Sequence, residues 1–595
     1  MSEQDIIKGL EPLFNPKSVA VIGATNNWNK WGFSTFSSSL DGFKGPVYPV
    51  NIREDKVLGH KAYKKITDIK DPVDLAAFVI PAPYIPAVME ECVEKGVKAG
   101  VIIAAGFQEI GEEGKKLQDE VVRAAKKGGI RFVGPNCMGY WSASSNLRAF
   151  MFPMPVRPGP IAFVSQGGNV GGAVVMSGHA RGIGFHRYIS CGATADIQIE
   201  EYIEHFGQDP EVKVILTYIE GLNDGRKFME VAKRVSLKKP IIALKPGKTN
   251  AAAKAISSHS GSLSGIDKIY DAVFRECGII RANTAEELLD YAMGFLTQPL
   301  PGGRNVAIIT PGGSYGVLCA DACAVEGLNV LDLPEKTIEE FNEIFPPRWS
   351  HGNPVDPAGD RNFLGYLRAP DMLLNLDIID AIIFMGFGSF SGFSSMMDSD
   401  SSGIGPAGNM FGSMFGSLKG FDKLADQMTT AFESGDPAKI KRLIRPISSM
   451  FGSMMGSGRK EDSEEFTNLL TSMIEFSGSG ASFLNSFPKM IKSISSGNME
   501  ELDIASVFEG LEPFMGSLII QWILKHKKPV VTTSFTEGAP TLSGGHHAFP
   551  SGDTASKVLS KLVYYKEYLE AEGHYKDKEF DPLEFWWVSE YMNKE

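Results

Sequence analysis

The stretch SVAVIGATNNWNKWG, residues 18–32, decides the fold of this chain. It opens with a run of small and β-branched residues that ends at Gly23, and the turn from Gly23 to Gly32 leads into a segment expected to be helical. Such apolar runs are typical of strands that are buried on both faces of a parallel sheet. The stretch therefore predicts a strand, a glycine turn and a helix, which is the first step of an α/β fold.

The same pattern recurs through the first 140 residues. Three more apolar runs end in Gly or Pro, and two segments between them have the charged outer face of a surface helix. The runs are VDLAAFVIP (73–81), AGVIIAAG (99–106) and IRFVGP (130–135), and the helical segments are residues 83–98 and 112–129. This alternation predicts a doubly wound, Rossmann-like sheet, which we assign to residues 1–145.

Two further α/β units follow, so the fold class is three Rossmann- or flavodoxin-like parallel-sheet domains in tandem. We place the second domain at residues 150–298 and the third at 303–595, separated by the Pro/Gly segment QPLPGGR (298–304). The second has strand candidates at 159–164, 211–221 and 238–248. Those of the third are NVAIITPGG (305–313), DAIIFMGFG (380–388) and KKPVVTTSF (527–535).

The last two of these runs are too far apart for one βα crossover. The segment 389–512 between them is rich in Met, Gly and Ser, as in FGSMFGS (411–417), and holds 11 of the 23 methionines of the chain. A mobile linker is one reading of this composition. Helical spacing of the apolar residues in FDKLADQMTTAFES (421–434) favours the other, an ordered helical insert in the third domain that makes contacts between chains.

Composition excludes several classes of protein. The net charge of −12 argues against a nucleic-acid-binding protein. No run of about 18 apolar residues and no signal peptide is visible, so we expect a cytoplasmic protein without a membrane span. The six cysteines form no CxxC motif, and Cys319 and Cys323 lie four apart, which indicates helix packing rather than a metal site.

The turn from Gly23 to Gly32 has the context in which backbone N–H groups hold a phosphate at a helix N-terminus. A tight βα turn without a ligand is the alternative, because the second glycine of the dinucleotide motif is missing. The next strand ends in Pro49-Val-Asn-Ile-Arg53 and offers no acid at its tip for an NAD ribose. Arg53 suits a phosphorylated ribose instead.

A second strand-to-helix turn is Ser165-Gln166-Gly167-Gly168. It predicts either an oxyanion site or a turn closed by a serine N-cap. A lone histidine, His259, lies in the Ser/Gly segment SSHSGSLSG, which offers no apolar face to bury the ring. A nucleophile that moves between sites would need such a loop. Glu220, at the end of a predicted strand, is its expected partner because a carboxylate fixes the imidazole tautomer.

Together these residues resemble the α-subunit, with CoA-binding and ligase domains, of NDP-forming acyl-CoA synthetases, which are relatives of succinyl-CoA synthetase. The resemblance covers almost the whole chain outside the insert, in many matches that occur in order. They include SVAVIGAT, GPVYPVN, VIIAAGFQEIGEEG, GPNCMGYW, IAFVSQGGNVG, YIEGLNDGRKF, SSHSGSLSG and NPVDPAGD.

The resemblance implies roles for these residues. CoA would be held by Gly23, Ala24, Thr25, Gly32, Asn51, Arg53, Pro81 and Ala82. His259 would be the phosphorylated histidine, Glu220 its orienting carboxylate, and Ser165, Gln166, Gly167 and Gly168 the binding site of the phosphoryl group. The enzyme would be an acid–thiol ligase that acts on a small carboxylic acid through an acyl phosphate.

The family also needs an ATP-grasp module, and no such segment follows the third domain. We therefore expect a partner β-subunit that binds ATP or ADP with Mg, in a hetero-oligomer such as a heterotetramer. Two other functions remain open. One is a non-catalytic CoA-binding regulator, which the presence of both His259 and Glu220 argues against. The other is an NAD(P)-dependent oxidoreductase.

Overall fold

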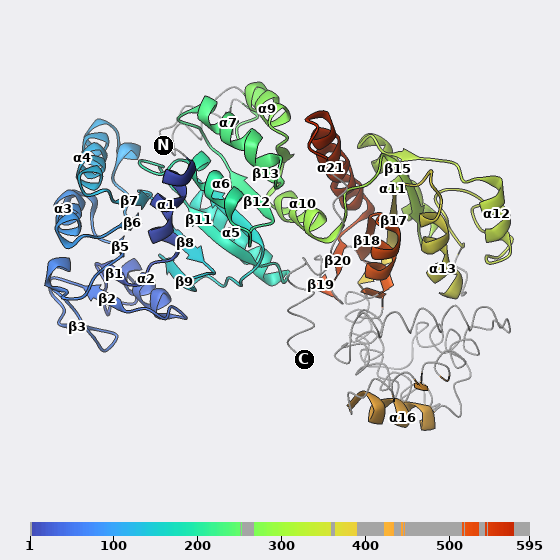
Figure 1. Cartoon of the computed structure of the whole chain (residues 1–595), viewed down its shortest axis with the longest axis horizontal. Coiled ribbons are helices and arrows are strands. Elements are labelled where there is room, and N and C mark those ends of the chain that lie inside the picture. The colour runs from blue at the N-terminus through green and yellow to red at the C-terminus, as the bar shows by residue number, and fades with distance from the viewer. Residues whose placement is uncertain are drawn as a thin grey trace. The chain divides into compact units, whose positions relative to one another are not determined.

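The computed structural model forms two compact units: unit 1 is residues 1–292 with 571–574, and unit 2 is residues 293–570 with 575–595. Figure 1 shows the elements along the chain. The residues that the structure describes are 3–249, 251–252, 267–358, 363–389, 422–433, 439, 442–443, 446, 515–516, 518–534, 542–543 and 546–575.

The first sheet of unit 1 has five parallel strands in the order β2-β1-β5-β6-β7. Alternate residues of β1 point to opposite faces. Val19 and Val21 pack in one apolar core with α1 and α2, and Ala20 and Ile22 pack in another with α3 and α4. Helices cover both faces, so the predicted doubly wound fold is confirmed. The bounds are β1 Val19–Ile22, β2 Val47–Val50, β5 Leu75–Phe78, β6 Ala99–Ile102, β7 Arg131–Val133, α1 Glu3–Phe14, α2 Trp31–Leu40, α3 Ile85–Lys95 and α4 Glu112–Gly128; a small hairpin, β3 Lys56–Val57 and β4 His60–Lys61, follows β2.

The second sheet has the order β14-β13-β12-β10-β11-β8-β9. Its first five strands are parallel, and β8 and β9 form an antiparallel hairpin that pairs with β11. The boundary that we placed between residues 145 and 150 falls inside this hairpin and needs correction, because a hairpin turn requires no crossover helix that would mark it in the sequence. The bounds are β8 Gly139–Ser142, β9 Leu147–Phe150, β10 Ile161–Ser165, β11 Phe185–Ser190, β12 Val214–Tyr218, β13 Ile241–Leu244, β14 Ile280–Ala282, α5 Gly168–Ala180, α6 Ile199–Gln208, α7 Gly225–Ser236, α9 Asp267–Glu276 and α10 Ala285–Thr297.

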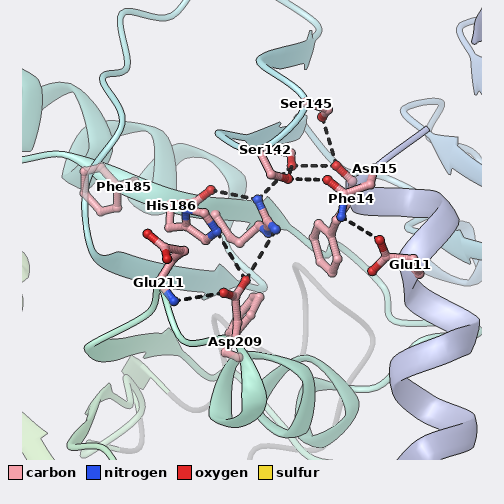
Figure 2. Close-up of polar contacts among 12 residues, drawn as sticks. Glu11, Phe14, Asn15, Ser142, Ser145, Phe185, His186, Asp209 and Glu211 are labelled. Atoms are coloured by element: carbon pink, nitrogen blue, oxygen red, sulfur yellow. Dashed lines mark hydrogen bonds and ion pairs between the residues drawn. The ribbon is translucent and has the colours of Figure 1, made fainter. Parts of the chain in front are cut away.

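The C-terminal end of α1 is held by residues of the second sheet (Figure 2). The last carbonyl groups of a helix have no intrahelical partner. Here the hydroxyl of Tyr140 donates to the carbonyl oxygen of Leu13 at 2.6 Å, and that of Ser142 donates to Phe14 at 2.7 Å. Buried Arg187 donates to Ser142 at 2.9 Å and pairs with Asp209 at 3.3 Å. The first helix of the chain therefore ties the two sheets of unit 1 together.

Unit 2 contains a sheet in the order β16-β15-β17-β18-β20-β19, which is parallel except for β19. All three strands predicted for this region are present and adjacent. Because β17 pairs with β18, Ile382 opposite Val530, the two predicted strands that precede and follow the insert in the sequence are neighbours in the sheet. The bounds are β15 Asn305–Ile309, β16 Asn329–Val330, β17 Ala381–Ser389, β18 Val530–Ser534, β19 Leu542–Ser543, β20 His546–Phe549, α11 Gly313–Val325, α12 Glu335–Asn342, α13 Phe363–Leu374, α16 Asp422–Glu433 and α21 Gly552–Ala571.

Most of the predicted insert 389–512 lies outside the described residues. Within it, α16 coincides with the segment for which the sequence predicts a helix. The order of the rest and its contacts stay predictions. Cys319 and Cys323 lie on α11, and the Sγ atom of Cys323 is 3.2 Å from the hydroxyl of Ser556. Among the helices of the described part of the chain, none has both the length and the apolar character of a membrane span.

Candidate functional site

The first glycine turn joins β1 to α2. At two of its positions, Gly23 and Gly32, the backbone packs so closely against another part of the backbone that there is no room for a side chain. Gly23 has a φ of +95°, and a Cβ atom added there would lie 2.3 Å from the carbonyl oxygen of Val79. A Cβ atom on Gly32 would lie 2.0 Å from the carbonyl oxygen of Gly23. Only glycine fits these positions. The first N–H groups of α2 have no intrahelical partner and lie beside this turn, which suits a phosphate.

Asn51 connects the end of β2 to the same turn. Its side-chain amide donates to the carbonyl oxygen of Ala24 at 2.7 Å, and its Oδ1 accepts from the N–H groups of Arg53 at 2.8 Å and Glu54 at 3.0 Å. The side chain of Asn51 therefore shapes the backbone of the turn. The side chain of Arg53 is exposed.

Glu54 is a residue of this edge that the sequence analysis missed. Its carboxylate accepts from the hydroxyl of Thr25 and from the N–H group of Asn26 at 3.0 Å. The Thr25 hydroxyl lowers the pKa of Glu54. The statement that no acid stands near this strand tip is thus wrong, although the acid is bound to the turn itself. An acid four residues past a strand, opposite a Thr-Asn turn, was the available signal.

Pro81 and Ala82 follow β5 at the same edge of the sheet. Pro81 precedes a short 3-10 helix, η2 (Ala82–Tyr84), and Ala82 is buried. Its Cβ atom would lie 3.2 Å from a Cβ atom added to Gly106, which follows β6. The loops after β1, β2, β5 and β6 therefore share the carboxyl edge of the sheet, where open α/β sheets bind their ligands.

In the second turn, Ser165 to Gly168, the polar side chains form hydrogen bonds with other groups of the protein. The hydroxyl of Ser165 donates to the carbonyl oxygen of Gly167 at 2.8 Å. The side chain of Gln166 accepts from the N–H groups of Glu220 at 2.6 Å and Gly221 at 3.0 Å and donates back to Gly221 at 2.9 Å. Gln166 thereby fixes Glu220 beside the turn. An oxyanion here would meet the N–H groups of the first turn of α5, whose N-cap residue Gly167 has no side chain.

A cavity of about 580 Å³ in unit 1 brings residues of both sheets together. Of the predicted site residues, Gln166, Gly167, Gly168 and Glu220 line it. The eight predicted CoA residues and Ser165 do not, although Trp31, the neighbour of Gly32, does. The remaining lining residues are Ile103, Ala105, Glu109, Asn136, Cys137, Met138, Met151, Phe152, Asn169, Val170, Gly192, Ala193 and Tyr218.

Two neutral groups and two carboxyl groups are the titratable side chains of this cavity. Burial raises the pKa of the Cys137 thiol to about 12, and burial, with the nearby charge of Glu220, raises that of Tyr218 to about 12. Glu220 follows β12 and is 7% exposed. Glu109 was not predicted. His259 lies outside the described residues, so its pairing with Glu220 stays a prediction.

Three family models match consecutive parts of the chain. A CoA binding domain matches residues 17–142, a succinyl-CoA ligase like flavodoxin domain matches residues 158–295, and a Ligase-CoA domain matches residues 306–387. The alpha subunit of the ADP-forming acetate–CoA ligase II of Pyrococcus furiosus is 45% identical over 376 residues, which are 63% of this chain and 82% of that relative. The chain belongs to the alpha-subunit family of ADP-forming acyl-CoA synthetases. This confirms the predicted family and its class, acid–thiol ligases.

Two other proteins of the synthetase family match a similar share of this chain. The ADP-forming acetate–CoA ligase of Methanocaldococcus jannaschii is 43% identical over 345 residues, 58% of this chain but 48% of that relative. Among solved structures, the dinucleotide forming acetyl-coenzyme A synthetase 1 of Ca. Korarchaeum cryptofilum, in complex with phosphate and ADP, has 36% identity and a TM-score of 0.59. That alignment covers 63% of this chain and 81% of the other.

Proposed function

We propose that this chain is the CoA-binding subunit of an NDP-forming acyl-CoA synthetase, which interconverts acyl-CoA, phosphate and ADP with a carboxylic acid, CoA and ATP. The cavity carries the proposal. It places Trp31, beside the predicted CoA turn, in one space with the N-terminus of α5 and with Glu220. A thioester, a phosphate and a histidine phosphoryl acceptor would have to meet in such a space.

The reaction runs through two intermediates. A phosphate oxygen attacks the thioester carbonyl, CoA leaves as the thiol, and an acyl phosphate remains. The N–H groups of α5 stabilise the phosphoryl oxygens. His259 then attacks phosphorus, the carboxylate leaves, and the phosphohistidine passes its phosphoryl group to ADP. Glu220, fixed by Gln166, orients the imidazole.

The nucleotide step is assigned to a partner β-subunit with an ATP-grasp fold that binds ADP or ATP with Mg. The name of the Pyrococcus furiosus relative, a subunit alpha, supports a second subunit. The match covers 48% of the Methanocaldococcus jannaschii ligase, and the unmatched remainder of that relative is long enough to hold a further module. The substrate is a small carboxylic acid, and this chain and the β-subunit form a hetero-oligomer such as a heterotetramer.

Reconstitution tests the proposal. The purified chain is expected to bind CoA. Its melting temperature should rise when CoA is added and should not change when NAD is added. With an ATP-grasp β-subunit it forms acyl-CoA from acid and ATP, at a rate on the order of 1–10³ per second, and His259→Ala abolishes this activity. Turnover by the isolated chain would contradict the need for a partner. CoA binding without turnover in the complex would favour a non-catalytic CoA-binding regulator.

A further inference from the structure

Glu109 is a carboxyl group of the cavity with no role so far. It lies in the 3-10 helix η3 (Gln108–Ile110), which follows β6 of the first sheet. The N–H group of Gly106 donates to its Oε1 at 2.6 Å. Its Oε2 is buried and has no hydrogen-bond partner among the residues that the structure describes. One oxygen thus fixes the carboxylate, and the other is left to accept a proton.

The side of the cavity on which Glu109 lies is the side of the CoA domain. Ile103, Ala105 and Glu109 follow β6, at the sheet edge that carries the predicted CoA turn. Glu220 comes from the second sheet, beside the N-terminus of α5. If CoA binds at the first turn, its thiol reaches the cavity past Trp31 on the side of Glu109, whereas the phosphoryl group occupies the side of Glu220.

Thioester formation needs a base at that position. A free thiol has a pKa of about 8.5, and its thiolate is the nucleophile, so most of the thiol is inactive at pH 7. Cys137 and Tyr218, with pKa values of about 12, are protonated and cannot take the proton. No Lys, Arg or His occurs among the described residues that line the cavity. Glu109 is the remaining acceptor on the CoA side.

We infer that Glu109 is the general base for the CoA thiol, an inference that rests on the proposed function. The sulfur lone pair forms the bond to the carbonyl carbon of the acyl phosphate, and the thiol proton passes to Oε2 of Glu109. The bond between that carbon and the bridging oxygen breaks, and its electron pair leaves with phosphate. In the reverse direction the Glu109 carboxylic acid returns the proton to the departing thiolate.

Glu109→Gln in the complex with the β-subunit tests this role. The glutamine oxygen still accepts from Gly106 but takes no proton. Two reactions are compared: acyl phosphate with CoA to give the thioester, and acyl phosphate with ADP to give ATP, which needs no thiol. We expect the first rate to fall about 100-fold at pH 7 and the second to fall less than threefold. Glu113→Gln, an exposed residue of α4, is the matched control and should change neither.

The pH profile separates a base from a merely structural residue. As pH rises from 6.5 to 9, the thiol ionises without help, so the ratio of wild-type to Glu109→Gln thioester rates should fall toward one. An unchanged thioester rate in the variant overturns the inference. So does an equal loss in both reactions with a constant ratio across pH, which would mean that Glu109 only supports the loop. If the wild-type complex catalyses neither reaction, the proposed function itself fails.

Discussion

At the scale of single residues, the backbone at Gly23 adopts a φ of +95°, and the carbonyl oxygen of Val79 lies 2.3 Å from where a Cβ atom would be. Gly23→Ala should therefore destabilise the protein by at least about 2 kcal/mol, from left-handed strain plus steric overlap. Because relieving the overlap with Val79 must displace the backbone of the turn proposed to hold CoA, CoA affinity should fall more than tenfold. Urea unfolding and calorimetric titration with CoA measure the two effects.

Gly96→Ala is the matched control. Gly96 ends α3 with a φ of +78°, but nothing lies within 4 Å of an added Cβ atom. Only the backbone strain, about 1 kcal/mol, is expected there, with unchanged CoA affinity. Equal losses of stability in both variants, or full CoA binding by Gly23→Ala, would contradict a role of the turn in holding CoA.

The sequence predicted where the site lies better than which atoms are available in it. Gly23 and Glu220 follow predicted strands, and Gly32 lies in the first turn of the predicted helix. Ser165 and Gln166 are also where they were expected, yet their side chains bond within the protein. A motif fixes the position of a polar residue along the chain, whereas its hydrogen bonds depend on strands far away in sequence. Glu109 could not be predicted from the sequence for the same reason, because the cavity that it lines is completed by residues of the second sheet.

At the scale of elements, continuous apolar runs gave reliable strands, because strands buried on both faces need no polar residues. Even β17 and β18, separated by about 140 residues, were recognised from such runs and pair directly. The hairpin β8–β9 was missed. Its strands, GYWS and LRAF, are short and mix polar with aromatic residues, and only pairing with β11 defines them.

The contact of α1 with α6 makes stability depend on pH. The ring of His205 on α6 lies 4.6 Å from that of Phe14 on α1. Burial, and then the charge of Arg187, lowers the pKa of His205 to about 4, against an ordinary value of 6.5. The unfolded chain binds this proton first, so the stabilisation is complete above pH 6.5 and is lost as pH falls toward 4. At pH 5 the loss is about 2 kcal/mol.

His205→Phe keeps a ring against Phe14 and removes the titrating group. Between pH 7 and pH 5, its free energy of unfolding should change by about 2 kcal/mol less than that of the wild type. Urea titrations at both pH values measure the difference. His60→Gln, at an exposed position, serves as control and should follow the wild type. A parallel pH dependence of wild type and His205→Phe would place the titrating group elsewhere.

At the scale of the whole molecule, the cavity depends on the relative position of the two sheets of unit 1, because residues of both sheets line it. Arg131 on β7 of the first sheet joins them. Its Nε lies 2.9 Å from Asp196 and its Nη2 lies 3.0 Å from Glu201, both of the second sheet's α6 region. Burial raises the pKa of Asp196 in spite of the nearby arginine. Removing the guanidinium would leave two buried carboxylates close to each other.

Arg131→Met should therefore destabilise unit 1 by about 3–5 kcal/mol at pH 7. The cost should shrink as pH falls, because the unpaired carboxyl groups then bind protons more readily in the folded chain than in the unfolded one. Adding Asp196→Asn and Glu201→Gln removes the unpaired buried charges and should restore much of the lost stability.

Lys127→Met is the control. It breaks the exposed ion pair with Glu90, at 2.9 Å, and should cost less than about 1 kcal/mol. Urea unfolding of the four proteins at pH 5 and 7 gives the comparison. A loss in Arg131→Met that is independent of pH, and that the two amide substitutions leave unchanged, would show that apolar contacts of the arginine stem hold the sheets instead.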